Sequence, residues 1–129
     1  MKKLLLPLIL ALMPAISEAR IGETLDECTA RYGPMLKVEN ATGKFFSDYP
    51  QYCFELNYVR IRVRFYKGRS AQEEFASFDL TDKRDEILAS NSEKETGFKI
   101  VVDRSIDNRL TITTLEFDRL MRKELGSGF

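Results

Sequence analysis

The chain has 129 residues, and its 20 lysine and arginine residues are balanced by 20 aspartate and glutamate residues. This zero net charge gives no general attraction to nucleic acid or to an anionic membrane surface, so nucleic acid is not expected as a partner. The chain contains no histidine, which excludes a Ser-His-Asp or Cys-His catalytic site within it and removes the commonest metal ligand. We therefore expect no enzyme, no cofactor and no metal site.

The N-terminus has the pattern of a secretory signal peptide. Two lysines precede a nearly unbroken apolar run at positions 4–16, and Ser17 and Ala19 place small residues three and one positions before a cut. The alternative is a membrane anchor, but a spanning helix needs about 20 apolar residues, and this run is shorter and contains prolines. We predict a signal peptide at 1–19, cleavage after Ala19, and a single exported domain at 20–129. That domain is expected in the periplasm or outside the cell, without a transmembrane segment.

The first helix of the domain is predicted between Thr24 and Gly33. Thr24 and Glu27 have the spacing of a capping box, in which each side chain bonds the backbone of the other residue. Residues 34–51 contain prolines, glycine and asparagine and are predicted as a loop. The residues of the helix that recur at helical spacing, and that should face the core, are Leu25, Cys28, Thr29 and Tyr32.

Three strands are predicted next, as an antiparallel meander. Apolar side chains alternate in one phase at 54–58 and in the other at 59–65, so a turn is expected at Asn57-Tyr58, because a regular strand keeps its phase. Tyr66-Lys67-Gly68 is predicted as the loop of the following hairpin, since glycine adopts positive φ without strain. The third strand is predicted at 70–78.

The C-terminal half is predicted to contain a second hairpin between two helices. One helix begins at Leu80-Thr81-Asp82, with Thr81 or Asp82 as its cap, and a polar link at 91–97 follows it. The hairpin strands are predicted at 98–102 and 110–112.

A C-terminal helix is predicted at 114–125, because Thr113 and Glu116 repeat the capping-box spacing. The alternative is a strand that continues through Phe117. The resulting order, α-βββ-α-ββ-α, predicts an α+β domain in which two to three short helices pack on an antiparallel sheet made of a meander and a second hairpin.

The two cysteines of the chain are Cys28 and Cys53. In an oxidising compartment such a pair predicts a disulfide bond, which would stabilise the domain by about 3 kcal/mol through closure of a loop of about 25 residues. Two buried free thiols, or one reactive thiol, are the alternatives. The bond requires Cys53 to face the first helix, and its alternation with Phe54 and Leu56 leaves that direction open.

Three arginines, Arg60, Arg62 and Arg64, share one face of the second strand. Guanidinium groups at a spacing of about 7 Å suit carboxylate or phosphate partners. The alternative is a solvated face that is neutralised across the hairpin, where a three-residue loop would place Glu74 opposite Arg60 and Gln72 opposite Arg62. Because Glu74 neutralises only one of the three, we predict that these arginines form a contact surface.

Two segments carry a resemblance to known proteins. Arg20 to Thr24, Cys28 and the sequence Arg31-Tyr32-Gly33-Pro34 resemble the start of small exported bacterial proteins of unassigned role, and the hairpin from Val63 to Arg69 fits the same resemblance. More distantly, a short helix ending in Tyr-Gly-Pro before a meander is similar to the SmpA/OmlA-type outer-membrane assembly lipoproteins, which share an architecture with the β-lactamase inhibitor protein. The resemblance implies a domain that binds other proteins and catalyses nothing. This chain departs from the lipoproteins by lacking their lipid-bearing cysteine, and no functional residue is carried over.

Two functions follow as predictions. The first is a non-catalytic domain that binds another protein in the cell envelope. The alternative is a binder of an anionic glycan, lipid headgroup or other polyanion through Arg60, Arg62 and Arg64. The two differ in their dependence on ionic strength, because contacts driven by charge weaken as salt is added.

Overall fold

The computed structural model of the protein describes residues 19–40, 43–104 and 106–126, and positions 1–18 of the predicted signal peptide lie outside them. The strands are β1 (Lys37–Glu39), β2 (Gln51–Leu56), β3 (Val59–Tyr66), β4 (Arg69–Ala76), β5 (Ile100–Asp103) and β6 (Arg109–Thr114). The helices of this part are α2 (Leu25–Tyr32), α3 (Lys44–Ser47), α4 (Thr81–Ser90), α5 (Glu93–Thr96) and α6 (Leu115–Leu125).

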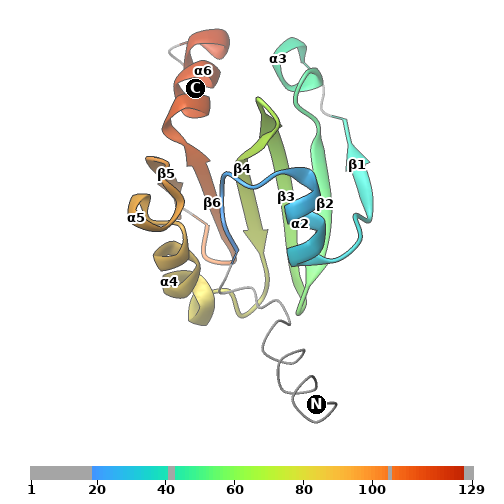
Figure 1. Ribbon diagram of the computed structural model, residues 1–129, viewed down its shortest axis with the longest axis vertical. Coiled ribbons are helices and arrows are strands. Elements are labelled where there is room, and N and C mark those ends of the chain that lie inside the picture. Colours follow the sequence, from blue (N-terminus) through green and yellow to red (C-terminus); the bar gives the residue numbers. More distant parts are fainter. Residues whose placement is uncertain (1–18, 41–42, 105, 127–129) are drawn as a thin grey trace, which may run out of the picture.

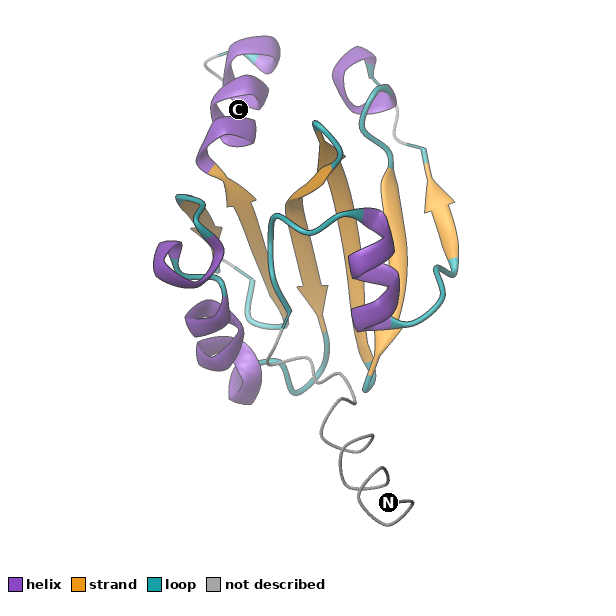
Figure 2. Cartoon of the chain, in the orientation of Figure 1, coloured by secondary structure: helices purple, strands orange, loops and turns teal. Residues whose placement is uncertain are grey.

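The strands form one open antiparallel sheet in the order β1-β2-β3-β4-β6-β5 (Figure 1). Helix α2 lies in front of the central strands, α4 and α5 lie beside β5 and β6, and α3 and α6 stand at one end of the sheet (Figure 2). The α+β class is therefore confirmed, with the order α-β-βββ-α-ββ-α for the main elements. None of the described helices is long and apolar enough to cross a membrane.

Two-residue turns join β2 to β3 and β3 to β4. Asn57 and Tyr58 have φ values of 51° and 65°, and Lys67 and Gly68 have values of 54° and 79°. Positive φ at both central residues is what a two-residue hairpin turn requires. The turn predicted at 57–58 is thus confirmed, whereas the second loop is one residue shorter than predicted.

The shorter loop changes which residues face each other across β3 and β4. The pairing also shifts at a bulge next to Arg64, and a bulge adds one residue to one strand. The two effects together place Glu74 opposite Arg62 and Ala76 opposite Arg60. The predicted pairing of Arg60 with Glu74 is therefore wrong by two residues.

The main core lies between one face of the sheet and helices α2 and α4. Val59, Ile61 and Val63 of β3 are buried on this face, together with Cys28 and Tyr32 of α2. Because side chains alternate along a strand, the arginines between these β3 residues point to the opposite face. Capping by Thr24 and Glu27 is present as predicted. Of the four α2 residues predicted to face inward, Leu25 and Thr29 are exposed.

A smaller cluster lies where α3 and α6 meet the end of the sheet. Phe117 and Met121 of α6 pack with Ala71 of β4, and aromatic side chains of the α3 region complete the cluster. The ring of Phe117 lies 5.3 Å from that of Tyr49, centre to centre, in an edge-to-face arrangement. This cluster covers one end of the sheet and leaves the other end open.

Several short elements were not predicted. β1 and α3 lie in the segment predicted as a loop, and α5 lies in the predicted polar link, because elements of three or four residues are too short to show a periodic pattern. The N-cap of helix α4 is Leu80, and it makes no capping hydrogen bond through its side chain. The prediction that Thr81 or Asp82 caps this helix is therefore wrong. The helix at 114–125 is confirmed over Leu115–Leu125, with Thr114 as the cap in place of Thr113.

The predicted disulfide is wrong, because Cys28 and Cys53 are both buried free thiols. Cys28 lies in the main core under α2. Consecutive residues of a strand point to opposite faces, and since Phe54 enters the core, Cys53 points away from it and donates from Sγ to Glu39 Oε1 at 3.0 Å. Burial raises the pKa of both thiols, and the neighbouring Glu39 carboxylate adds to this at Cys53.

Candidate functional site

The three arginines predicted as a contact surface lie in three different environments. Arg64 is the most enclosed, with 9% of its surface exposed. Its Nε donates to the Tyr49 carbonyl at 2.9 Å, its Nη1 donates to Gln72 Oε1 at 2.8 Å, and its guanidinium lies 4.5 Å from the ring centre of Phe46. Burial lowers the pKa of this guanidinium. Arg64 therefore fastens the segment after α3 to the sheet and is not open to a partner.

Arg62 is neutralised within the sheet. Its Nε donates to Glu39 Oε1 at 3.2 Å, and its Nη1 donates to Glu74 Oε1 at 3.1 Å. The hydrogen bonds from Cys53 and Arg62 lower the pKa of the Glu39 carboxyl group. Arg62 thus joins β1, β3 and β4 through two carboxylates.

Arg60 is exposed, and within the described ranges it forms no ion pair. Its neighbour across β4 is Ala76, and Ala76 in turn pairs with Arg109 of β6. Neighbouring strands lie about 4.8 Å apart, so the backbones of the two arginines are separated by about 10 Å. Arg109 Nε lies 3.6 Å from Glu74 Oε1, a carboxylate that already accepts a hydrogen bond from Arg62.

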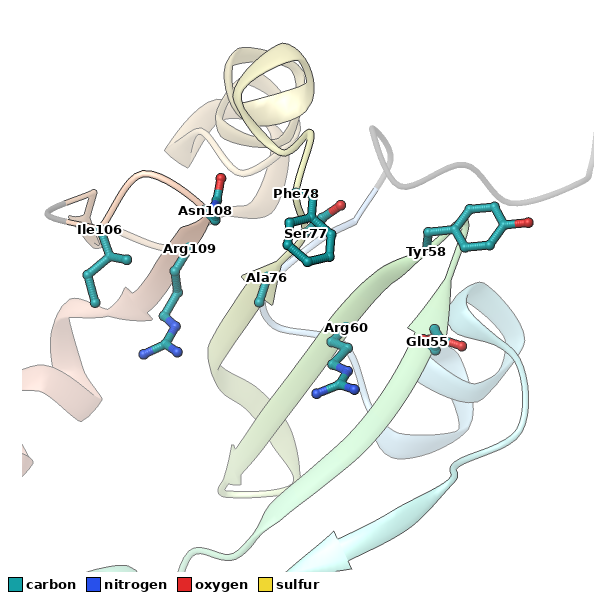
Figure 3. Close-up of a pocket in the computed structure, with 9 residues that line it drawn as sticks. All are labelled: Glu55, Tyr58, Arg60, Ala76, Ser77, Phe78, Ile106, Asn108 and Arg109. Carbon is teal, nitrogen blue, oxygen red and sulfur yellow. The ribbon is translucent and has the colours of Figure 1, made fainter.

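A pocket of about 490 Å³ lies between Arg60 and Arg109, at the end of the sheet opposite to α6. We call it the end pocket. The small side chain of Ala76 forms its floor, and Arg60 and Arg109 extend in the same direction on either side (Figure 3). Glu55, the register partner of Arg60 on β2, also borders it. The complete lining is Glu55, Tyr58, Arg60, Ala76, Ser77, Phe78, Ile106, Asn108 and Arg109.

The rim of the end pocket carries three large exposed side chains that are mostly apolar. Tyr58 is 92% exposed, Phe78 is 98% exposed and Ile106 is 52% exposed. Large exposed apolar patches mark interaction sites in soluble proteins, and these three side chains border the same pocket. The pocket therefore combines two cationic walls with an apolar rim.

The antiparallel topology explains why these residues meet. The β2–β3 turn carries Tyr58, the link from β4 to α4 carries Phe78, and the loop between β5 and β6 carries Ile106, and all three connections lie at the same end of the sheet. Of the lining residues, Arg60 alone was predicted as a binding residue, and Tyr58 was predicted as part of a turn. Phe78 was predicted as the last residue of the third strand, but β4 ends at Ala76, so Phe78 lies in the link after the strand and is exposed there.

A second polar cluster is enclosed in the main core. Tyr32 Oη donates to Glu73 Oε1 at 2.5 Å, and Ser70 Oγ donates to Glu73 Oε2 at 2.8 Å. Ser70 also receives hydrogen bonds from the backbone N–H groups of Gly22 and Glu23. This cluster is closed to ligands and connects α2, β4 and the segment before α2.

Among the described residues, no group of three or more cysteine, aspartate or glutamate side chains is arranged to hold a metal ion. Comparisons of the chain with protein-family models, with curated proteins and with solved structures give no match. The resemblance to exported envelope proteins therefore remains a prediction. The function has to be argued from the end pocket itself.

Proposed function

We propose that this chain is an exported, non-catalytic domain that binds a protein partner through the end pocket. The observation that carries the proposal is the pair Arg60 and Arg109, which flank Ala76 beneath exposed apolar side chains. Aromatic residues and arginine are the residue types enriched at protein–protein interfaces. When a partner removes large exposed aromatic side chains from water, the burial of their apolar surface favours binding.

The charges of the end pocket indicate the chemistry of the partner. Arg60 has no ion pair in the described part of the chain, and Arg109 shares the carboxylate of Glu74 with Arg62. Both guanidinium groups therefore have hydrogen-bond donors for an incoming carboxylate, which a planar guanidinium binds through two parallel bonds. The proposed occupant is a segment of a protein in which an acidic side chain stands next to an apolar one.

The pocket favours such a segment over an extended polyanion. A polyanion needs a continuous row of available cations, but Arg62 and Arg64 are already bonded within the sheet. The same face also carries the carboxylates of Glu39 and Glu74. The alternative ligand, an anionic glycan, lipid headgroup or other polyanion, was predicted to bind Arg60, Arg62 and Arg64. Of these three arginines, Arg60 is the one that remains available to it.

A photo-crosslinking experiment tests the proposal. A photoreactive amino acid replaces Phe78 in the exported chain, and a control chain carries it at Glu86, an exposed position of α4. Position 78 should give a discrete crosslinked product with one envelope protein, and position 86 should not. The product should weaken in an Arg60→Gln background and at raised salt. Equal yields from both positions, or a yield that Arg60→Gln leaves unchanged, would overturn the proposal.

A further inference from the structure

A second pocket lies between α3 and α6, at the end of the sheet opposite to the end pocket (Figure 1). We call it the helix groove, and its volume is about 350 Å³. The rings of Phe45 and Tyr49 border it with their centres 5.0 Å apart, and both rings pack against the buried ring of Phe117. The smaller core cluster therefore holds its apolar side in place. The complete lining is Phe45, Asp48, Tyr49, Leu120, Glu124 and Leu125.

Two carboxylates border the helix groove, and its lining holds no lysine or arginine. Asp48 and Glu124 are exposed, and within the described ranges neither forms an ion pair. Glu124 lies in the last turn of α6, where the helix dipole disfavours a negative charge. Stability of the helix therefore does not explain this residue, and both carboxylates are available to a cationic partner.

The helix groove has the chemistry that the end pocket requires of its occupant, which is an acidic side chain next to an apolar one. Asp48 is followed by Tyr49 in the sequence, and Glu124 is followed by Leu125. All four residues border the helix groove, so the acidic and the apolar groups share one surface. A second copy of the chain therefore offers the guanidinium groups of the end pocket two carboxylates beside apolar surface.

The end pocket in turn has the chemistry that the helix groove requires. Phe78 on its rim is 98% exposed, and a groove lined by apolar side chains would remove this ring from water. The lining of the end pocket holds two arginines against one glutamate, Glu55, so its net charge is positive, whereas that of the helix groove is negative. The two ends of the molecule are thus complementary both in charge and in apolar surface.

We infer that the partner of the end pocket is a second copy of this chain, which docks through its helix groove, so that copies associate head to tail. The inference rests on the proposed function and names the partner at the same pocket. The chain carries equal numbers of acidic and basic residues, so net charge does not oppose association of copies. Because two different surfaces meet, each added copy leaves one of each open, and the assembly grows unless a ring closes.

Sedimentation equilibrium of the purified protein tests this association. The average mass of the wild type should increase with protein concentration and decrease with added salt, because charge contributes to the contact. Arg60→Glu places a carboxylate in the end pocket and should abolish association. The groove variant, Asp48→Asn/Glu124→Gln, removes both carboxylates of the helix groove and should weaken association by at least about tenfold. A matched control, Asp85→Asn/Glu86→Gln, makes the same charge change at exposed positions of α4 and should associate as the wild type does.

A mixture of the two altered proteins identifies the two surfaces that meet. The Arg60→Glu chain keeps its helix groove, and the groove variant keeps its end pocket. Together they should form a pair of chains and nothing larger, because both sites left open on the pair are altered. Formation of the pair also shows that both variants are folded. A mixture that remains single chains, or a control variant that associates as weakly as the groove variant, would overturn the inference.

The crosslink at position 78 separates failure of this inference from failure of the proposed function. A second copy predicts a product with twice the mass of the chain, in which position 78 is joined to a peptide from α3 or α6. A wild type that stays a single chain up to about 1 mM would overturn the inference. In that case a product with a different envelope protein would leave the proposed function standing, whereas the absence of any product would overturn both.

Discussion

The hydroxyl group of Tyr32 donates a 2.5 Å hydrogen bond to Glu73 Oε1 in the main core, where Glu73 is 1% exposed. Desolvation raises the pKa of the Glu73 carboxyl group from 4.5 to about 7, although the hydrogen bonds from Tyr32 and Ser70 favour its charged form. The nearby Glu23 carboxylate raises this pKa further, and Arg31 opposes that effect. The same burial raises the pKa of Tyr32 well above its ordinary value, so Glu73 is the member of the pair that titrates near neutral pH.

The first prediction concerns stability and pH. Between pH 4.5 and about 7 the folded chain holds a proton on Glu73 that the unfolded chain has lost, so the free energy of unfolding should decrease as pH rises through this window. Stabilisation by this group is complete below pH 4.5 and is lost above about pH 7. The expected loss is on the order of 3 kcal/mol. Denaturant unfolding at a series of pH values measures it.

Glu73→Gln isolates this effect, because glutamine keeps a hydrogen-bonding group and cannot ionise in this range. The variant should show a much flatter dependence of unfolding free energy on pH between 5 and 8, and it should be at least as stable as the wild type at pH 8. Parallel pH profiles for the variant and the wild type would contradict the assignment to Glu73.

The second prediction compares two arginines of one strand. Arg64→Gln removes hydrogen bonds to Tyr49 and Gln72 and the contact with Phe46, so it should lower the free energy of unfolding by about 1–3 kcal/mol. Arg60→Gln changes an exposed side chain and should alter it by less than about 0.5 kcal/mol. Denaturant unfolding of both variants provides the comparison, and an equal loss for the two would refute the different environments assigned to them.

The third prediction concerns two glycines. Gly22 and Gly33 have φ values of 88° and 92°, which non-glycine residues rarely adopt. A methyl group at Gly22 would overlap the ring of Phe98, whereas one at Gly33 would meet open space. Gly33→Ala therefore measures the backbone strain alone, of about 1 kcal/mol, and Gly22→Ala should cost about 1–3 kcal/mol more. Thermal or denaturant unfolding would show the difference, and similar losses would argue against close packing of Phe98 on Gly22.

The fourth prediction concerns the thiols. Because Cys28 and Cys53 are free, a reducing agent should leave the unfolding midpoint unchanged, whereas loss of a disulfide of this loop length would cost about 3 kcal/mol. Both thiols should react slowly with an alkylating agent in the folded protein, because they are buried and their pKa values are raised. Mass spectrometry after unfolding should find both alkylated. A peptide containing both residues joined would show that the bond forms after all.

Much of the fold could be predicted from periodic patterns, and the parts that could not depend on exact register. The phase change between Leu56 and Val59 located the first hairpin correctly, because alternation is a strong local signal. The pairing across β3 and β4 failed because the length of one turn and a bulge next to Arg64 together moved it by two residues. That shift placed Glu74 against Arg62, so it changed which arginine remained open.

The end pocket was beyond sequence reasoning for the same reason. Arg60 and Arg109 are separated by 49 positions in the sequence, and they become neighbours only because both pair with Ala76. The direction of Cys53 was left open by its strand pattern, and the entry of Phe54 into the core decided it. Local patterns predicted the elements of this domain, whereas its site depends on contacts between distant strands.

The affinity of the partner identified by crosslinking at position 78 tests the central claim most directly. Titration calorimetry would compare the wild type, Arg60→Gln and a matched control, Arg119→Gln, which changes an exposed arginine on α6 at the other end of the sheet. A hydrogen bond to a charged group contributes about 1.5–3 kcal/mol, so Arg60→Gln should weaken binding by at least about tenfold. Arg119→Gln should leave the affinity unchanged. Equal affinities for the wild type and Arg60→Gln would contradict binding through the end pocket.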